Sequence, residues 1–537
     1  MTCARFDPGD GEPKDLTPPR LYKPQRVGVS AHGMVSSQHY RATEAGIQAL
    51  QEGGNAIDAA VAAAFALGVC EPAASGLGGQ TMMLIHLARR RRTVALDGSS
   101  RAPNRTSVAA LPQSQRRRGY KATTVPSTPA VLGYALEHYG SMSLPALIQP
   151  AVELAERGYR VSQLQHGLAQ RVRKSLKRWS AAQHFLKNGV RPFRAGELCR
   201  QPALAQTLRR LARAGIEDFY TGEIAGAMCR DMACNDGLIT REDLAQIPWP
   251  LERRPVSCRY EGLRVVTFPP PGAGRTLIEL LNIVSHFPLK YRQADTPRGA
   301  VLLARAIQQA NRDRRDRPYD ASFYAQVTQR RMLSPDHGKA IARRALKEIR
   351  THGDTTHLSV MDREGNVVAL TQSIERVYGA CVATPELGFL YNNYMLAFED
   401  TDISHPYYLR PNAVPWASVA PTIVLRGQRP WLTIGSPGSE RIASSVAQVL
   451  LRLRNHSPFE AVDAPRLHCA VDGTVSLEIS RMRSDIPDAL RRYGFEIDER
   501  DPYSFYLGCV QLVMREGGRF IGVADPRRDG SAGGPEQ

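Results

Sequence analysis

The chain has 537 residues, of which 42% are hydrophobic and 23% charged, values typical of a globular protein with several layers of secondary structure. Its net charge is +18, from 70 Lys and Arg against 52 Asp and Glu. Short basic clusters occur at 89–92, 116–118 and 312–317, but no helix-turn-helix, RNP-like or zinc-finger pattern accompanies them. A nucleic-acid partner is therefore not expected, and a basic surface that attracts small anions is the simpler interpretation.

Membrane and metal partners are also not expected. No stretch approaches the ~18 consecutive apolar residues that a spanning helix needs. The N-terminal residues are polar and proline-rich, without the apolar centre of a signal peptide, so we predict a cytoplasmic protein. The nine cysteines form no CxxC pair and no His/Cys cluster with metal-ligand spacing. We expect free cysteines without a metal-binding or catalytic role, and no cofactor.

The chain begins with a proline-rich arm at 1–32 that lacks hydrophobic periodicity. Apolar residues with helical spacing then predict helices at 42–52, 56–67, 128–140, 144–158, 202–215 and 222–237. Alternating or apolar runs around short polar turns predict strand pairs at 82–96, 257–269, 355–373 and 421–435. Helices combined with many hairpins indicate antiparallel sheets between helical layers.

The segment that begins at Thr355 is the most informative. Taken alone, a Thr that opens a strand indicates no more than β-propensity. However, TTHLSVMDREGNVVALTQS resembles the start of the small subunit of the γ-glutamyltranspeptidase (glutathione hydrolase) family. Further blocks resemble the same family in the same order, at 33–72, 125–162, 215–245, 269–284, 387–395, 419–424 and 435–442. The resemblance covers roughly 30–525.

This resemblance implies a fold and a maturation step. The fold is an α/β (α+β) four-layer αββα sandwich of the N-terminal-nucleophile hydrolases, with mainly antiparallel sheets. The chain is expected to cut itself between Asp354 and Thr355. A large-subunit region, 33–354, and a small-subunit region, 355–537, would then stay associated as one composite body.

The implied chemistry centres on Thr355. A Thr hydroxyl needs a nearby base, and the α-amine released by the cut, with a pKa of about 7.7–8.0, can supply one. By resemblance, Ser373 supports the nucleophile, and the backbone amides of Gly438 and Ser439 form an oxyanion hole. His357 is interpreted as structural because the α-amine already provides the base.

The substrate pocket departs from the family at six positions. Ser99 replaces the Arg that holds the substrate α-carboxylate, and Ala397 replaces the Asp that holds its α-ammonium. Glu375 and Tyr394 replace an Asn and a Gln, Ala417 replaces one of two serines, and Ser439 replaces a Gly. We expect the acyl group of the substrate to contact the residues now present there, which are Ser99, Arg101, Glu375, Tyr394 and Ser418.

Three interpretations therefore stay open. The chain could be an acyl-enzyme-forming γ-glutamyltranspeptidase-like amidohydrolase or acyltransferase that accepts a small amide or peptide. It could instead hydrolyse a different small acyl amide, such as an oxamate or a cephalosporin side chain. A non-catalytic structural relative is the third, although the intact Asp354-Thr355-Thr356 argues against it.

Overall fold

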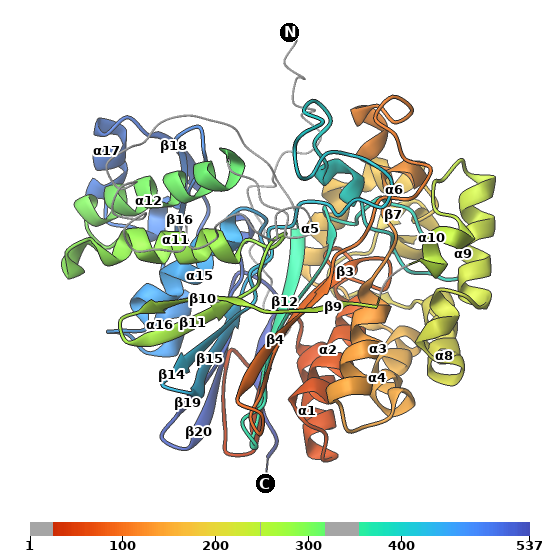
Figure 1. The fold of residues 1–537 in the computed structure, drawn as a ribbon, viewed down its shortest axis with the longest axis horizontal. Helices are drawn as coiled ribbons and strands as arrows, with labels where there is room; N and C mark the ends of the chain where they lie inside the picture. Colours follow the sequence, from red (N-terminus) through yellow and green to blue (C-terminus); the bar gives the residue numbers. More distant parts are fainter. Residues whose placement is uncertain (1–24, 247–248, 317–353, 537) are drawn as a thin grey trace.

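Two stacked seven-stranded sheets, antiparallel throughout, form the centre of the structure (Figure 1). The computed structural model describes residues 25–246, 249–316 and 354–536. In spatial order, the first sheet contains β1 (Val27–Ser30), β20 (Arg519–Ala524), β19 (Gln511–Glu516), β15 (Arg429–Gly435), β14 (Thr422–Arg426), β11 (Leu263–Thr267) and β10 (Val256–Tyr260). The second contains β21 (Ser531–Gly533), β2 (Gly33–Ser37), β12 (Asp354–Asp362), β13 (Val367–Glu375), β3 (Gln80–Leu87), β4 (Arg92–Gly98) and β9 (Leu251–Arg253).

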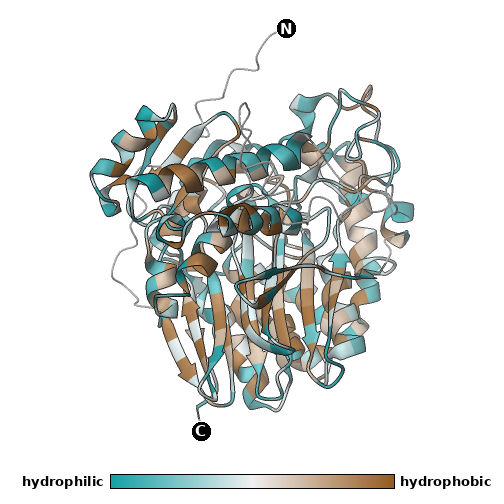
Figure 2. Ribbon diagram, turned by 60° about the vertical axis from the view of Figure 1, so that its left-hand side comes forward, coloured by the Kyte–Doolittle hydropathy of each residue, from teal (hydrophilic) through white to brown (hydrophobic). Residues whose placement is uncertain are grey.

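Helices cover the outer faces of both sheets and complete the four layers predicted from the sequence. The second sheet is covered by α1 (Tyr40–Gln51), α2 (Ala56–Cys70), α3 (Thr128–Tyr139) and α4 (Leu144–Arg157). The first sheet is covered by α11 (Gly274–Ser285), α12 (Pro297–Asp316) and α15 (Arg441–Arg452). A separate apolar layer between the sheets includes Met82, Ala95, Val266 and Ile423. Figure 2 shows the hydrophobic positions concentrated on the strands and on the helix faces that cover them.

Smaller elements surround this sandwich. Beyond α4 lie α8 (Pro202–Ala214) and α9 (Glu223–Cys234), together with α5 (Gln163–Arg171), α6 (Arg173–Arg178), α7 (Ala182–Phe185), α10 (Arg241–Ala245) and the short strands β5 (Tyr159–Arg160), β6 (Leu186–Lys187), β7 (Arg191–Pro192) and β8 (Leu198–Cys199). On the opposite side, β16 (Leu467–Cys469), β17 (Thr474–Glu478) and β18 (Glu496–Arg500) form a sheet beside α16 (Pro458–Asp463) and α17 (Asp485–Arg492).

The predicted hairpins and the first helix pair are confirmed. The segment 355–373 forms β12 and β13, which are the third and fourth strands of their sheet, and 421–435 forms β14 and β15. The alanine-rich α2 is buried all round, as expected for a helix without a polar face. Asn55 caps it through a capping box with Asp58, which satisfies backbone N–H groups of the first turn.

The arm predicted at 1–32 includes a strand. Residues 27–30 pair with β20, and a four-residue edge strand is too short to show periodicity in the sequence. Residues 1–24 of that prediction lie outside the described residues. No helix in the described ranges combines the length and hydrophobicity needed to cross a membrane.

Some arginines of the basic clusters form ion pairs and hydrogen bonds inside the protein. Arg116 is buried, forms an ion pair with Asp400 at 3.1 Å and donates to the Leu111 carbonyl. Arg118 donates to the carbonyl of Val377. Three residues of the 89–92 cluster, Arg89, Arg90 and Arg91, occupy the predicted turn between β3 and β4, and Arg92 begins β4.

A close approach between the sheets makes Gly435 essential to packing. A Cβ atom added to Gly435 would lie 2.2 Å from the His357 ring. We expect Gly435→Ala to lower the free energy of unfolding by about 1–3 kcal/mol, the usual cost of overpacking. Thermal unfolding measures the change, with Gly226→Ala in α9 as control, because its Cβ would meet only arginine side-chain ends. A Gly435→Ala protein as stable as the wild type would contradict this packing.

Candidate active site

A break in the strand register places Thr355 at the start of β12. Asp354 pairs with Glu375 and Thr356 pairs with Gln372, so Ser373 and Ile374 together lie opposite Thr355. Such a bulge bends the strand and redirects a side chain. Thr355 is nevertheless 5% exposed, so its hydroxyl lies in an enclosed environment.

The Thr355 hydroxyl belongs to a chain of hydroxyl groups. Thr355 Oγ1 donates to Ser373 Oγ at 3.3 Å, and the backbone N–H of Glu375 donates to the same Ser373 oxygen at 2.9 Å. The Tyr394 side chain also hydrogen-bonds Ser373, and burial raises the pKa of its phenol. Ser373 therefore links the predicted nucleophile to Tyr394.

A buried cation holds the main chain of Thr355. Arg528 Nη1 lies 3.2 Å from the Thr355 carbonyl oxygen, 3.0 Å from Glu71 Oε1 and 3.0 Å from Gln38 Oε1. Glu71 also accepts a hydrogen bond from the Thr356 hydroxyl. The backbone at the predicted cleavage site is thus fixed from one side by charge-assisted hydrogen bonds.

His357 is fully buried two residues further along β12. Its Nδ1 contacts Thr371 Oγ1 at 2.8 Å and its Nε2 contacts Ser359 Oγ at 3.2 Å. Burial lowers the pKa of this imidazole to about 3, so it is neutral at physiological pH. Both ring nitrogens bond to neighbouring strand residues, as the predicted structural role requires.

The Gly438-Ser439 turn connects β15 to α15. Gly438 has φ +119° and Ser439 has φ +52°, so both adopt backbone conformations in which a side chain is strained. Across the described part of the chain, neither backbone amide donates a hydrogen bond. Non-glycine residues with positive φ are concentrated at functional sites, and Glu375, at φ +75°, is another example here.

Arg314, near the end of α12, lies among the predicted pocket residues. It donates to Ser418 Oγ at 3.3 Å and to the Ala417 carbonyl at 2.7 Å, and its guanidinium lies over the Trp416 ring. Burial lowers the pKa of Arg314 to about 10, while the nearby carboxylates of Glu440 and Glu375 act in the opposite direction. Ser418 thus contacts Arg314, while Glu375 and Glu440, which follows the Gly438-Ser439 turn, are near enough to act on its charge.

Ala397 adjoins the same region, since its carbonyl accepts a hydrogen bond from the Trp416 amide at 3.4 Å. Ser99 is engaged elsewhere: its hydroxyl donates to Asp97 at 2.6 Å, and Asp97 pairs with Arg253. Arg101 donates to the Asn412 carbonyl at 3.2 Å. Ser373, in contrast, bonds directly to Thr355, and Tyr394 is connected to Thr355 through the Ser373 hydroxyl.

Comparison with known proteins identifies the family of this chain. The sequence model of the family described as Gamma-glutamyltranspeptidase matches residues 42–534. The chain belongs to the γ-glutamyltranspeptidase family. It is therefore an enzyme of the N-terminal-nucleophile hydrolase class, an amidohydrolase or acyltransferase.

Relatives of two kinds lie within this family. The chain is 31% identical to the glutathione hydrolase proenzyme of Bacillus subtilis (strain 168), over 96% of this chain and 94% of the relative. It is 34% identical to the acylase ACY 1 proenzyme of Pseudomonas sp. (strain SE83), over 94% of each. Among solved structures, the cephalosporin acylase from Bacillus halodurans superposes with a TM-score of 0.86 at 28% identity, covering 96% of this chain and 98% of that one.

Sequence reasoning missed Arg528, Glu71 and Arg314. Arg528 and Thr355 are 173 residues apart, and no spacing pattern signals such a contact. Asn392 and Asn393 also connect distant loops, since Asn392 Nδ2 donates to the Gly78 carbonyl and Asn393 Nδ2 donates to the Arg117 carbonyl. No cluster of three or more potential metal ligands occurs among the described residues.

The buried neutral state of His357 predicts a pH dependence of stability. An unfolded histidine has a pKa of about 6.5, whereas burial lowers that of His357 to about 3. As the pH falls below 6.5, the unfolded chain therefore binds a proton that the folded chain does not, and stability is lost at up to about 1.4 kcal/mol per pH unit. Denaturant unfolding of the Thr355→Ala chain between pH 4 and 6 should show a shallower slope when His357→Asn is added. His32→Asn, at an exposed histidine, is the matched control. An equal slope with and without His357→Asn would show that folded His357 takes up a proton.

Proposed function

We propose that the chain cuts itself before Thr355, and that Thr355 then forms the acyl-enzyme of an amidohydrolase or acyltransferase. The observation that supports this most directly is the hydrogen bond from Thr355 Oγ1 to Ser373 Oγ at the register break. It places a hydroxyl acceptor against the predicted nucleophile, next to the bond that would be cut.

In the cleavage step, Thr355 Oγ1 attacks the carbonyl carbon of Asp354 and its proton passes to the departing backbone nitrogen. The C–N bond breaks and an ester links Asp354 to the Thr355 side chain. Water then hydrolyses this ester, which leaves a carboxylate on Asp354 and a free α-amine on Thr355. Arg528, bonded to the Thr355 carbonyl, would hold the residue in place through these steps.

In turnover, the new α-amine takes the Oγ1 proton as the oxygen attacks a substrate amide. The amides of Gly438 and Ser439 would stabilise the oxyanion, which is consistent with their positive φ angles and their lack of a partner among the described residues. The substrate amine leaves with a proton, and water or another amine then takes the acyl group from Thr355.

The sheet topology supports association of the two fragments after cleavage. The large fragment would contribute β1, β2, β3 and β11, and the small fragment β20, β12, β13 and β14. Each strand of the first set pairs with one of the second set, so both sheets would be shared. Loss of the peptide bond before Thr355 leaves this pairing intact.

For the acyl group, we propose a small carboxylic acid without an α-ammonium group. Ala397 offers no carboxylate to such an ammonium, whereas Arg314 supplies a cation beside Ser418 for an acid group. Glutathione hydrolases and acylases are both similar to this chain, and the acylase similarity supports a non-γ-glutamyl substrate. Ordinary γ-glutamyl transfer is the alternative, for which Glu375 would have to bind the ammonium.

We expect the purified protein to separate on a denaturing gel into fragments 1–354 and 355–537, with Thr355 as the new amino terminus. Thr355→Ala should remain one band, because it lacks the attacking oxygen, whereas Thr355→Ser should still be cut. The exposed Thr221→Ala in the turn before α9 is the matched control and should cleave like the wild type.

Ser373→Ala should slow cleavage about 5-fold or more. The variant loses one neutral hydrogen bond to Thr355, and a loss of ~1 kcal/mol corresponds to that change in rate. Intact mass and amino-terminal sequencing identify the site. A wild-type chain that stays whole after prolonged incubation would remove Thr355 as the nucleophile.

The acyl proposal predicts a preference between two matched anilides. The γ-glutamyl and glutaryl p-nitroanilides differ only in the α-ammonium group, and we expect higher kcat/KM for glutaryl. Ala397→Asp should shift the preference toward γ-glutamyl by roughly 10-fold or more, since a charge-assisted hydrogen bond contributes about 1.5–3 kcal/mol. Adding Ser99→Arg should raise γ-glutamyl turnover beyond either change alone, because the two charges hold opposite ends of one zwitterion. Efficient wild-type turnover of the γ-glutamyl substrate, unaffected by Glu375→Gln, would favour the plain family activity.

A further inference from the structure

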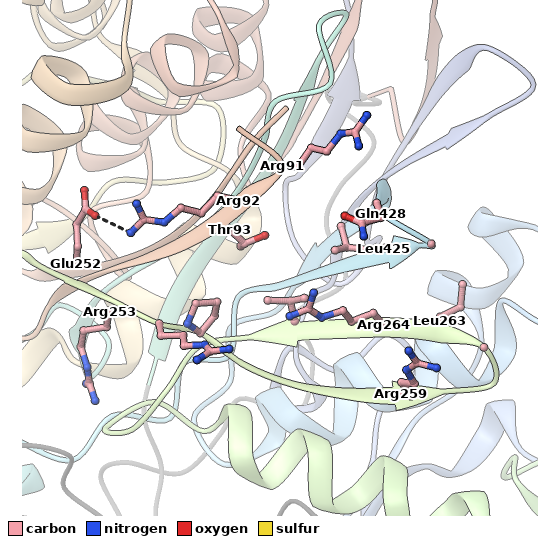
Figure 3. Close-up of a pocket in the computed structure, with 15 residues that line it drawn as sticks. Arg91, Arg92, Thr93, Glu252, Arg253, Arg259, Leu263, Arg264, Leu425 and Gln428 are labelled. Atoms are coloured by element: carbon pink, nitrogen blue, oxygen red, sulfur yellow. Dashed lines mark hydrogen bonds and ion pairs between the residues drawn. The ribbon is translucent and has the colours of Figure 1, made fainter. Parts of the chain in front are cut away.

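A basic groove opens at the margin of the sandwich, where the edge strands of the two sheets diverge (Figure 3). Its volume is about 670 Å³. It is lined by the β3–β4 turn, by β9 and the link to β10, by the β10–β11 hairpin and by the β14–β15 turn. In the order β12-β13-β3-β4-β9, Thr355 lies on the first strand and the groove adjoins the last two, so the groove is separate from the proposed active site.

Two of the lining arginines already have partners. Arg253 donates to Asp97 at 2.7 Å and points away from the other labelled arginines in Figure 3. Arg92 pairs with Glu252 at 3.4 Å. Glu252 also accepts hydrogen bonds from the hydroxyls of Tyr134 and Tyr139, so the groove's carboxylate is already engaged.

Four further arginines, all exposed, line the groove: Arg91, Arg254, Arg259 and Arg264. Within the described ranges, none of these four forms a salt bridge to an acidic side chain. Arg259 and Arg264 are direct partners across the β10–β11 ladder. Like charges in directly opposed positions destabilise a strand pair, so this arrangement costs stability in the free protein.

The groove also has an apolar floor. Val266 and Leu425 line it and are buried in the layer between the sheets. The volume is that of a small-molecule site, in the range of about 300–1,000 Å³. A guanidinium presents a planar fork of donors that fits phosphate oxygens in pairs.

We propose that this groove binds a small anion bearing two or more phosphate groups. Each phosphate would bridge neighbouring guanidiniums and remove the repulsion between Arg259 and Arg264. A single phosphate would leave much of the arginine charge uncompensated, and a long polymer would need a basic stripe that extends beyond this groove. Inorganic polyphosphates and nucleoside triphosphates share the required chemistry.

The test is calorimetric titration of the purified full chain with inorganic triphosphate, with ATP and with a 12-nucleotide DNA strand at low salt. We expect saturable 1:1 binding of triphosphate that weakens as salt increases, because charge pairing drives it. Similar affinity for ATP would show that the phosphates are recognised, and tighter ATP binding that the nucleoside also contributes.

Arg259→Ala with Arg264→Ala should weaken triphosphate binding by at least about tenfold. The charge-matched control, Lys177→Ala with Arg213→Ala on α6 and α8, should change it less than about twofold, since those exposed cations lie outside the groove. The groove variant removes opposed like charges, so its melting temperature should not fall, and lost binding cannot be attributed to misfolding.

Three results would overturn the proposal. They are no saturable binding of triphosphate or ATP, equal binding by the groove variant and the wild type, and binding of DNA without binding of triphosphate. All three are independent of whether Thr355 is a nucleophile.

Discussion

The register break between β12 and β13 is the constraint on which the candidate site depends. Because two residues of β13 lie opposite Thr355, the regular ladder ends at Thr356 and the Thr355 hydroxyl meets Ser373. From Leu358 to Met361, β12 is paired on both sides, by β2 and β13. The start of β12, which carries the proposed nucleophile, is thereby anchored by a strand ladder that does not depend on Asp354.

Several buried arginines are paired with carboxylates inside the molecule. Arg527 is buried between Glu478 and Asp525, and Arg466 pairs with Asp525 at 2.6 Å. The pKa of Asp525 is lowered despite its burial because these two guanidiniums stabilise the charged form. These arginines, like Arg116 with Asp400, are balanced by carboxylate partners, so they hold the interior together without adding to the net charge.

Local sequence patterns predicted the helices and strands, but they did not predict the contacts between residues far apart in the chain. Polar turns and alternating strands identified β12–β15, and apolar residues with helical spacing located α1 and α2. The pairing of β12 with β2 joins Leu358 to Ser37, which no local pattern encodes. The family resemblance pointed to Thr355 and Ser373, whereas the contacts of Arg528 and Arg314 depend on how the layers stack.

The hydrogen bonds of Arg528 to the Thr355 carbonyl, Glu71 and Gln38 also limit when Thr355 can be held in place during folding. Gln38, from just after β2, and Arg528, from just before β21, both take part, so these hydrogen bonds join opposite ends of the described chain. A nascent polypeptide cannot form these hydrogen bonds until residue 528 has left the ribosome, even though Thr355 emerges much earlier. Folding of the last strands thus precedes the hydrogen bond from Arg528 to Thr355, and a chain that stops short during translation would lack that contact.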